Sequence, residues 1–357
     1  MIDLVVTTFN SVLRKEKEMY LTIYKPVKRD FFTHEEWQSR KYTKVIPTLD
    51  DYNPNEEIAT AIANANNNPD VYWALGLDYL SILKNKAAHY RSFQIPKRDG
   101  SMRDIKTPTG NLKVIQKNIC YLMKSELKIL PHDCCHGFVK HRKCLSAMQR
   151  HQENGSMWFL KLDIKNFFPS ISSGLIYETF KTLPQTASLT PNVRRLLVDL
   201  LTDETGHLTQ GCISSPYIAN LVLMEFDYKF STWCAENNLT YTRYADDMCI
   251  SSRVKFKVGP VVNEVKSLLP PGLHINKEKT KLTSFNQENV FLGLHYNQNK
   301  DITVGYKTKH LMKVIDHKAS LGQIPFEERS LWKGRLAYYS SIEPDYFVGR
   351  FDNIRNL

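Results

Sequence analysis

Two adjacent carboxylates, Asp246 and Asp247, constrain this chain more than any other feature of its sequence. They lie between two runs rich in strand-forming residues, 239–242 and 248–250. That pattern predicts a β-hairpin with the acids at its tip. Two anions held side by side repel each other and are costly to bury without partners, so a divalent cation would explain the pair. An ordinary turn is the alternative, because Asp is common in turns.

A third acid stands where a further metal ligand would be needed. Residues 158–162 form an apolar run of strand length, and Asp163 ends it. A carboxylate at the end of a buried strand is well placed to bind a metal ion. A helix-capping Asp is the simpler interpretation of this position taken alone.

The composition is that of a soluble globular protein with excess positive charge. The 357 residues carry a formal net charge of +11, which favours a polyanionic partner. The cysteines are odd in number and include no Cys-x-x-Cys pair, so they predict neither a disulfide framework nor a zinc ribbon. We find no signal-peptide pattern and no membrane span, and we expect a cytoplasmic protein without membrane contact.

Two further stretches suggest contact with phosphates. Residues 90–96 and 101–106 predict two strands around a turn, and this hairpin carries basic residues at Arg91, Lys97, Arg98, Arg103 and Lys106. Such a hairpin suits the grip on a triphosphate or a phosphodiester backbone, although a solvated hairpin tip is the alternative. Residues 209–216 form a small polar loop that leads into a helix predicted over 217–230. Gly211 in this loop permits a close backbone approach, and the helix N-terminus suits a phosphate or a base edge.

Other elements are predicted from apolar spacing. They are helices over 58–65, 112–130 and 261–269, strands over 273–275 and 290–294, and a basic helical region from Lys307 to the end. The strand over 290–294 is expected to pair with 273–275 or with a neighbouring hairpin.

In their order along the chain, these motifs resemble those of a reverse transcriptase. Asp163–Phe168 resembles the first catalytic palm motif, Gln210–Pro216 the template and nucleotide motif, and 244–247 the Tyr-x-Asp-Asp box. Gly272–Thr280 resembles the next palm motif and Phe291–Gly293 the primer-grip motif. Each motif is weak singly, but five in the correct order argue strongly for the family.

The resemblance implies an α+β right-hand polymerase with fingers, a palm of antiparallel strands on helices, and a short helical thumb. The expected division is an N-terminal helical extension over 1–85, fingers over 86–156, the first part of the palm over 157–180, a connection over 181–211, the palm over 212–298 and the thumb over 299–357.

The resemblance also implies the site residues. Two Mg²⁺ ions, with Mn²⁺ as the alternative, would be held by Asp163, Asp246, Asp247 and the backbone carbonyl of Ile164. Lys97 and Arg103 would hold the triphosphate, and Lys279 would protonate the leaving pyrophosphate. Phe168 would exclude a ribose 2′-hydroxyl, so that dNTPs are the substrate. Gln210, Gly211 and Tyr244 would lie near the nucleotide and the template.

Within the family, the small size and the Thr-Arg-Tyr-Ala-Asp-Asp run over 242–247 resemble bacterial retron or other defence-associated enzymes. Retron enzymes usually carry Asn-Ala-x-x-His before the first palm motif, where this chain has Ser146-Ala147 and His151, and Val-Thr-Gly where it has Phe291–Gly293. The implied partners are an RNA template, a dedicated non-coding RNA in antiphage defence and nascent DNA, all in the bacterial cytoplasm. An effector protein or a homo-oligomer, a group II intron-like enzyme, template-independent or protein-primed synthesis, RNA-dependent RNA synthesis and a non-catalytic binding protein remain alternatives.

Overall fold

The computed structural model describes residues 79–97, 100–121, 123–124, 127–187, 189–284, 289–297 and 299–357. The helix predicted over 58–65, most of the N-terminal extension and Arg98 lie outside these residues. The chain divides into two compact units. The first contains the chain up to Pro131, Asn166–Met224 and Pro270–Leu273, and the second contains His132–Lys165, Glu225–Leu269 and His274–Leu357.

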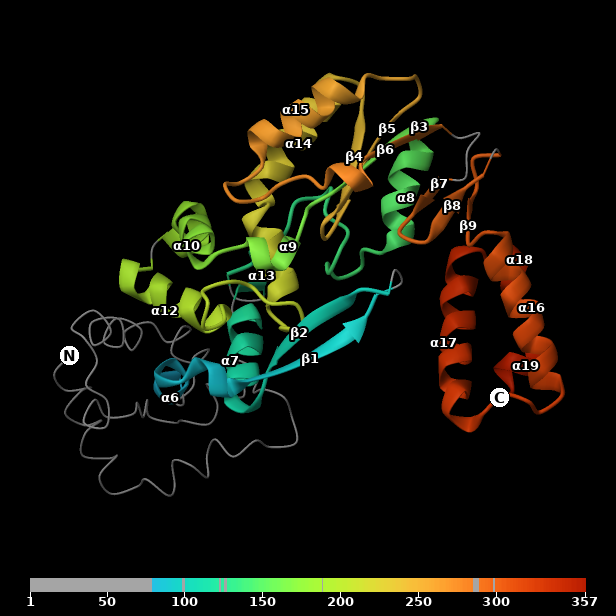
Figure 1. Cartoon of the computed structure of the whole chain (residues 1–357). Coiled ribbons are helices and arrows are strands. Elements are labelled where there is room, and N and C mark those ends of the chain that lie inside the picture. Colours follow the sequence, from blue (N-terminus) through green and yellow to red (C-terminus); the bar gives the residue numbers. More distant parts are fainter. Residues whose placement is uncertain are drawn as a thin grey trace. The chain divides into compact units, whose positions relative to one another are not determined.

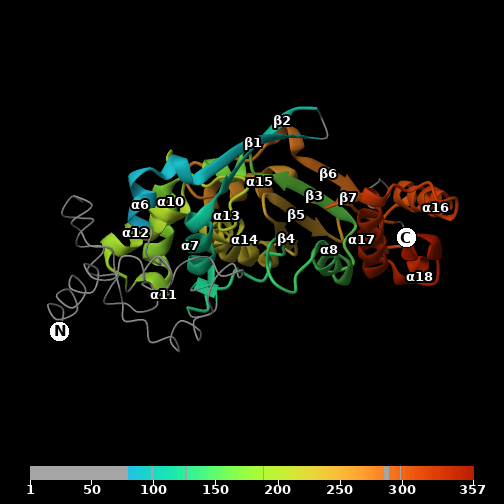
Figure 2. The same ribbon diagram turned by 90° about the horizontal axis from the view of Figure 1, so that it is seen from below.

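The second unit is built on a four-stranded antiparallel sheet. Its strands are β3 (Trp158–Asp163), β4 (Thr240–Tyr244), β5 (Asp247–Ser252) and β6 (Lys281–Ser284), in the order β4-β5-β3-β6 (Figure 2). The apolar run over 158–162 and the Asp-Asp hairpin are therefore both confirmed as strands of one sheet. In this register Asp163 lies directly opposite Asp247.

The two faces of this sheet carry different neighbours, because side chains alternate along a strand. Phe159 and Cys249 share a hydrophobic core with α8 (Cys144–Glu153). Tyr241, which is paired with Ile250, packs its ring against Phe230 of α14 (Met224–Glu236). A further helix, α15 (Val258–Leu268), follows the hairpin.

The core shared with α8 continues into the C-terminal part of the second unit. This part contains β7 (Asn289–Phe291), β8 (Leu294–Tyr296), β9 (Ile302–Thr303), α16 (Tyr306–Ser320), α17 (Phe326–Ile342), α18 (Pro344–Phe347) and α19 (Asp352–Arg355). The helix α19 packs against both α16 and α17 (Figure 1). The predicted basic helical region is thus confirmed, and Trp332 and Leu336 are buried in it.

One predicted strand is interrupted. Leu292 and Gly293 have φ of 56° and 79°, so the chain turns there and 290–294 becomes the two sides of the β7–β8 hairpin. The stretch pairs within itself and, through β8, with β9, rather than with 273–275 or a separate hairpin, while Ile275 forms an isolated bridge with Ile164.

The first unit combines one hairpin with helices. The predicted basic hairpin is confirmed as β1 (Tyr90–Pro96) paired with β2 (Met102–Pro108). The helices are α6 (Tyr79–Lys84), α7 (Gly110–Tyr121), α9 (Phe167–Ser170), α10 (Ser173–Thr182), α11 (Pro184–Ala187), α12 (Pro191–Leu201) and α13 (Ser215–Val222). The helix predicted over 112–130 is found over Gly110–Tyr121, and Met123 and Lys124 have π-helical backbone. The helix predicted over 217–230 is two helices, which break at Leu223. Among the described residues, every helix is too short or too polar to cross a bilayer.

Candidate active site

The tip of the β4–β5 hairpin is a tight turn held from two sides. Ala245 is buried and has a φ of 57°, in the left-handed region that residues other than Gly adopt only when their surroundings demand it. The guanidinium of Arg243 donates a hydrogen bond of 2.9 Å to the Ala245 carbonyl. On the other side Gly137 approaches so closely that a Cβ atom there would lie 2.6 Å from the Ala245 nitrogen. These contacts fix the backbone that presents Asp246.

A buried ion pair lies beneath this turn. Arg243 and Asp227 of α14 have fully buried side chains, and Nη2 lies 2.5 Å from Oδ2. The Tyr241 hydroxyl donates to the same carboxylate at 2.9 Å. Despite burial, the Asp227 charge keeps the pKa of Arg243 well above its usual value, so the guanidinium stays charged. The sequence analysis did not predict this pair. The local signal for it was a single Arg among the apolar residues of a strand, because a buried guanidinium needs an acidic partner.

The three acids meet where β3 ends and β5 begins. Asp163 pairs with Asp247 in the sheet register, and the Ile164 N–H donates to the Asp246 carbonyl at 3.1 Å. Asp163 is buried, whereas Asp246 and Asp247 are half-buried. Lys279 Nζ lies 2.8 Å from Asp163 Oδ2. The structure therefore brings four predicted site residues together, although they are spread over more than a hundred positions.

Repulsion among the three carboxylates raises the proton affinity of Asp247. Burial, and then the charges of Asp246 and Asp163, raise the pKa of Asp247 to about 6. The hydrogen bond to Asp163 raises the pKa of Lys279, which is therefore protonated at neutral pH. The ammonium groups of Lys279 and Lys161 lower the pKa of Asp247 but do not outweigh burial and the two neighbouring carboxylates.

This donor set fits a hard divalent cation. Carboxylate and carbonyl oxygens are the ligands that Mg²⁺ takes, with water completing its shell. Within the described part of the chain, no group of three or more His, Cys, Asp or Glu side chains is arranged so that it could already hold a metal ion. One oxygen of Asp163 is occupied by Lys279 instead.

Three of the predicted nucleotide-contacting residues of the first unit share one cavity, whereas Phe168 and Gly211 are not among the residues that line it. Lys97, Arg103 and Gln210 line a hollow of about 390 Å³, together with residues of α9 and the loop before α13. Phe168 is half-buried in α9 beside the Phe167 ring. Gly211 has a φ of 111° and lies against β2, where a Cβ atom would meet Ile105 Cγ2 at 2.6 Å.

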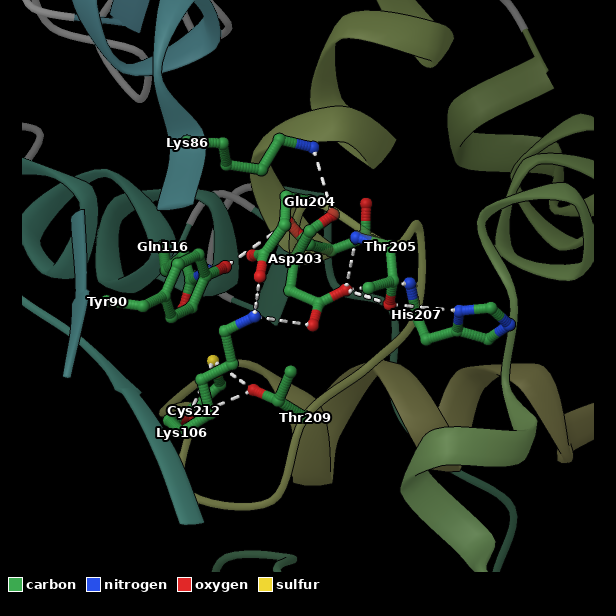
Figure 3. Close-up of polar contacts among 11 residues, drawn as sticks. Lys86, Tyr90, Lys106, Gln116, Asp203, Glu204, Thr205, His207, Thr209 and Cys212 are labelled. Carbon is green, nitrogen blue, oxygen red and sulfur yellow. Dashed lines mark hydrogen bonds and ion pairs between the residues drawn. The ribbon is translucent and has the colours of Figure 1, made fainter. Parts of the chain in front are cut away.

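Lys106 holds the loop that carries Gln210 and Gly211. Its backbone N–H donates to the Gln210 carbonyl at 2.8 Å, and its own carbonyl accepts from the Thr209 hydroxyl at 3.0 Å. Its ammonium group pairs with Asp203, at 2.9 Å, and with Glu204 (Figure 3). Sequence reasoning counted Lys106 among the cations that suit a phosphate grip, but its two acidic partners are supplied by a loop about a hundred residues later. Lys106 therefore ties the hairpin to this loop.

Comparison with known proteins points to one family. A family model described as reverse transcriptase (RNA-dependent DNA polymerase) matches residues 95–296. The retron Ec83 reverse transcriptase of Escherichia coli is 28% identical over 281 residues, which cover 75% of this chain and 88% of that protein. The retron Ec86 reverse transcriptase of Escherichia coli is 30% identical over 234 residues, or 64% of this chain and 69% of that protein. Among solved structures, telomerase from Candida albicans in complex with a fragment of telomeric RNA is 14% identical with a TM-score of 0.42, covering 65% of this chain and 50% of that one.

Proposed function

The chain belongs to the reverse transcriptase family of RNA-directed DNA polymerases, and from this premise we propose that it extends a primer with dNTPs by two-metal catalysis at Asp163, Asp246 and Asp247. The observation that carries the proposal is the meeting of these three carboxylates at the ends of β3 and β5. The raised pKa of Asp247 supports it, because such a cluster retains negative charge that a cation would neutralise.

Each site residue of the second unit has a defined role in this proposal. The three carboxylates and the carbonyl of Ile164 would supply oxygen ligands. When bound, two Mg²⁺ ions, or Mn²⁺ in their place, would lower the pKa of the primer 3′-hydroxyl and stabilise the pyrophosphate leaving group. Lys279 is a protonated amine within reach of Asp163, which suits a proton donor to pyrophosphate.

The first unit would bind the nucleotide. Lys97 and Arg103 line the same cavity as Gln210, which supports their assignment to the triphosphate. Gln210, Gly211 and Tyr244 keep their assignment to the nucleotide and the template. Phe168 would exclude the ribose 2′-hydroxyl and so select dNTPs.

We retain the division expected from the sequence as part of this proposal. It assigns the fingers to 86–156, the palm to 157–180 and 212–298 with a connection over 181–211, and the thumb to 299–357. The extension over 1–85 has no assigned task.

The metal assignment is tested by single substitutions in primer extension. Asp246→Ala and Asp163→Ala should each abolish nucleotide incorporation and leave RNA binding in place, because they remove oxygen ligands and no basic surface. Glu225→Ala is a matched control, since it removes an exposed carboxylate of the same unit and should extend the primer normally. Extension by Asp246→Ala at the parent rate would contradict the assignment.

Sugar selection is tested at Phe168. Phe168→Ala should raise incorporation of rNTPs relative to dNTPs, because the ring that would meet the 2′-hydroxyl is gone. Leu130→Ala, which truncates an exposed apolar side chain of the first unit outside the five motifs, should leave the ratio unchanged. A Phe168→Ala enzyme with the parent's discrimination would have no gate at this position.

The biological role proposed is antiphage defence with a dedicated non-coding RNA in the bacterial cytoplasm. The retron enzymes among the relatives support this choice within the family. Sequencing the nucleic acid that copurifies with the protein tests it: a single structured RNA, with DNA copied from it, is the expected result. DNA without a matching RNA would instead favour template-independent synthesis.

A further inference from the structure

The turn over residues 203–207 contributes to the nucleotide cavity of the first unit. Asp203, Thr205 and His207 all line this cavity. The Asp203 N–H donates to the His207 carbonyl at 3.0 Å, and His207 forms an isolated antiparallel bridge with Ser172. These backbone bonds fix the turn without using the imidazole of His207, so that side chain is available for another role.

Asp203 is a buried carboxylate that organises the turn. Its Oδ2 pairs with Lys106 Nζ at 2.9 Å. Its Oδ1 accepts from the Thr205 hydroxyl at 2.6 Å and from the backbone N–H groups of Thr205 and His207 at 2.9 and 3.3 Å (Figure 3). Burial opposes the charge, but the hydrogen bonds from Thr205 and Lys106 hold the pKa of Asp203 below its usual value. Asp203 is therefore ionised and can only accept hydrogen bonds.

This carboxylate determines which nitrogen of His207 carries a proton. The single hydroxyl hydrogen of Thr205 is donated to Asp203, so the Thr205 oxygen can only accept from a further group. His207 Nδ1 lies 3.3 Å from that oxygen and is therefore the donor. Figure 3 shows the other ring nitrogen, Nε2, on the side of the ring away from Thr205. Within the part of the chain that the structure describes, Nε2 has no hydrogen-bond partner, so a bound ligand can reach it.

The cavity that His207 lines is suited to an anion. Lys97 and Arg103 also line it, and both side chains are exposed. Lys106 lines it as well, but its ammonium group is already paired with Asp203 and Glu204. A triphosphate carries more negative charge than Lys97 and Arg103 supply, and a protonated imidazole would add to them.

The other charged residue among the described residues that line the cavity is Asp104. It accepts a hydrogen bond from the Gln94 side chain at 2.8 Å. The remaining segments beside the turn carry no charge there: they are Asn166, Pro169 and residues 171–173.

We propose that the His207 imidazole is a further phosphate-binding group of this cavity, which takes up a proton from solvent when a nucleoside triphosphate binds and donates a hydrogen bond from Nε2 to a non-bridging phosphate oxygen. The proton stays on the imidazole, so no bond of the nucleotide breaks in this step. Imidazole is suited to the role because its charge ordinarily changes near neutral pH, and a hydrogen bond between ionised partners is stronger than a neutral one. Thr205 is the positioning residue, since it holds Nδ1. The inference rests on the proposed function for the identity of the ligand, a dNTP.

Binding is measured on the full chain with inorganic tripolyphosphate in EDTA, so that neither catalysis nor a metal ion is needed. Isothermal titration calorimetry at about pH 7.5, in two buffers of different ionisation enthalpy, gives the affinity and the number of protons taken up. His207→Gln should weaken binding by about 10-fold and lower the uptake by up to about one proton per ligand. His207→Arg carries a permanent charge and should bind at least as tightly as the parent, with the same low uptake. His89→Gln is the control, because His89 is a half-buried histidine of the same unit outside the cavity lining, and it should behave as the parent does.

The positioning role of Thr205 is tested by a matched pair of variants. Thr205→Val keeps the shape of the side chain but removes the hydroxyl, so the imidazole loses its acceptor at Nδ1 and tripolyphosphate binding should weaken several-fold. Thr205→Ser keeps the hydroxyl and should restore the affinity of the parent. Equal affinity in Thr205→Val and Thr205→Ser would contradict the positioning role. This pair also decides the question if His207→Gln does not fold.

Primer extension shows whether the contact belongs to nucleotide binding. His207→Gln should raise the KM for dNTPs by about 10-fold and leave kcat nearly unchanged, because the contact would be made equally before and during the reaction. A fall in kcat with an unchanged KM would contradict the inference.

Unchanged tripolyphosphate affinity and proton uptake in His207→Gln would overturn the inference, as would an equal loss in His89→Gln. Failure of the proposed function has a different signature, because Asp246→Ala should lose incorporation yet keep the parent's tripolyphosphate binding and proton uptake. A parent chain that binds tripolyphosphate through His207 but never extends a primer would refute the proposed function and leave the anion site. A chain that extends primers with a KM indifferent to His207 would refute this inference alone.

Discussion

His151 shows how a single residue ties the helix α8 to the sheet that carries the acids. It is fully buried, and its ring nitrogens lie 2.8 Å from the Thr242 hydroxyl and 2.6 Å from the Ser251 hydroxyl. Thr242 belongs to β4 and Ser251 to β5, so the imidazole spans both strands of the hairpin. His151, which stands one position beyond the His of the retron Asn-Ala-x-x-His pattern, therefore connects α8 to the β4–β5 hairpin.

A pH dependence of stability follows from this burial. Burial, and then His136, lower the pKa of His151 to about 3, against an ordinary value of about 6.5. As the pH falls, the His151 imidazole is therefore protonated in the unfolded chain before it is protonated in the folded one. Its contribution to the free energy of unfolding is fully present above about pH 6.5 and is lost as the pH falls toward 3. The loss approaches about 1.4 kcal/mol per pH unit for one group. Urea unfolding between about pH 7 and 5 should show this slope, and it should shrink in His151→Gln but not in the exposed control His317→Gln. An equal slope in His151→Gln would assign it to other groups.

The buried pair of Arg243 and Asp227 makes a second prediction at this scale. Asp227→Ala should lower the free energy of unfolding by about 3–5 kcal/mol, because it removes the carboxylate that balances the buried charge of Arg243. Tyr241→Phe removes one hydrogen bond to the carboxylate and should cost about 1.5–3 kcal/mol. The exposed pair of Glu225 and Lys229 on the same helix is the control, and Glu225→Ala should cost less than about 1 kcal/mol. Similar losses for Asp227→Ala and Glu225→Ala would contradict the assigned role.

At the scale of elements, the docking of the 209–211 loop on β2 depends on Gly211. A side chain there would face both a forbidden φ of 111° and a contact of 2.6 Å with Ile105 Cγ2. Gly211→Ala should therefore displace Gln210, cost about 1–3 kcal/mol of stability and raise the KM for dNTPs. Gly334→Ala is the matched control: it has nothing within 4 Å, lies inside α17 and should be neutral or stabilising by up to about 1 kcal/mol. Urea unfolding measures the loss of stability, and steady-state kinetics measures the KM for dNTPs. An unchanged KM in Gly211→Ala would show that the position of this loop does not affect nucleotide binding.

The elements also show how far sequence reasoning reaches. Alternation and apolar runs predicted the strands that carry Asp163 and Asp247, because one buried face dictates that pattern. They did not predict the turn at Leu292 and Gly293, where a non-glycine residue takes a left-handed conformation that only tertiary contacts select. The partners of Arg243 and Lys106 were equally invisible, since Asp227 and Asp203 come from other elements and nothing local marks the pairing.

For the molecule as a whole, a continuous hydrophobic core joins one face of the second unit's sheet to its C-terminal helices. It includes Met148 of α8, Phe159 of β3, Tyr296 of β8 and Trp332 of α17. The predicted thumb and the sheet therefore contribute side chains to the same hydrophobic core. We infer that the C-terminal helices unfold together with the sheet that carries the acids.

The net charge of +11 makes the last prediction, which concerns affinity for nucleic acid. Each phosphate neutralised by Lys or Arg releases counterions, so log K should fall linearly with log salt, by about 0.7 per contact on a single strand. The parent chain should therefore lose affinity steeply between about 50 and 200 mM salt, measured by fluorescence anisotropy of labelled RNA. Lys140→Gln should reduce the slope by nearly one contact, whereas Phe326→Ala removes no charge and should preserve it. A flat salt dependence would mean that the excess charge serves solubility and that base contacts alone hold the strand. Lys140→Gln therefore tests the contribution of charge, because it removes a cation, and Phe326→Ala is its control, because it removes only a ring.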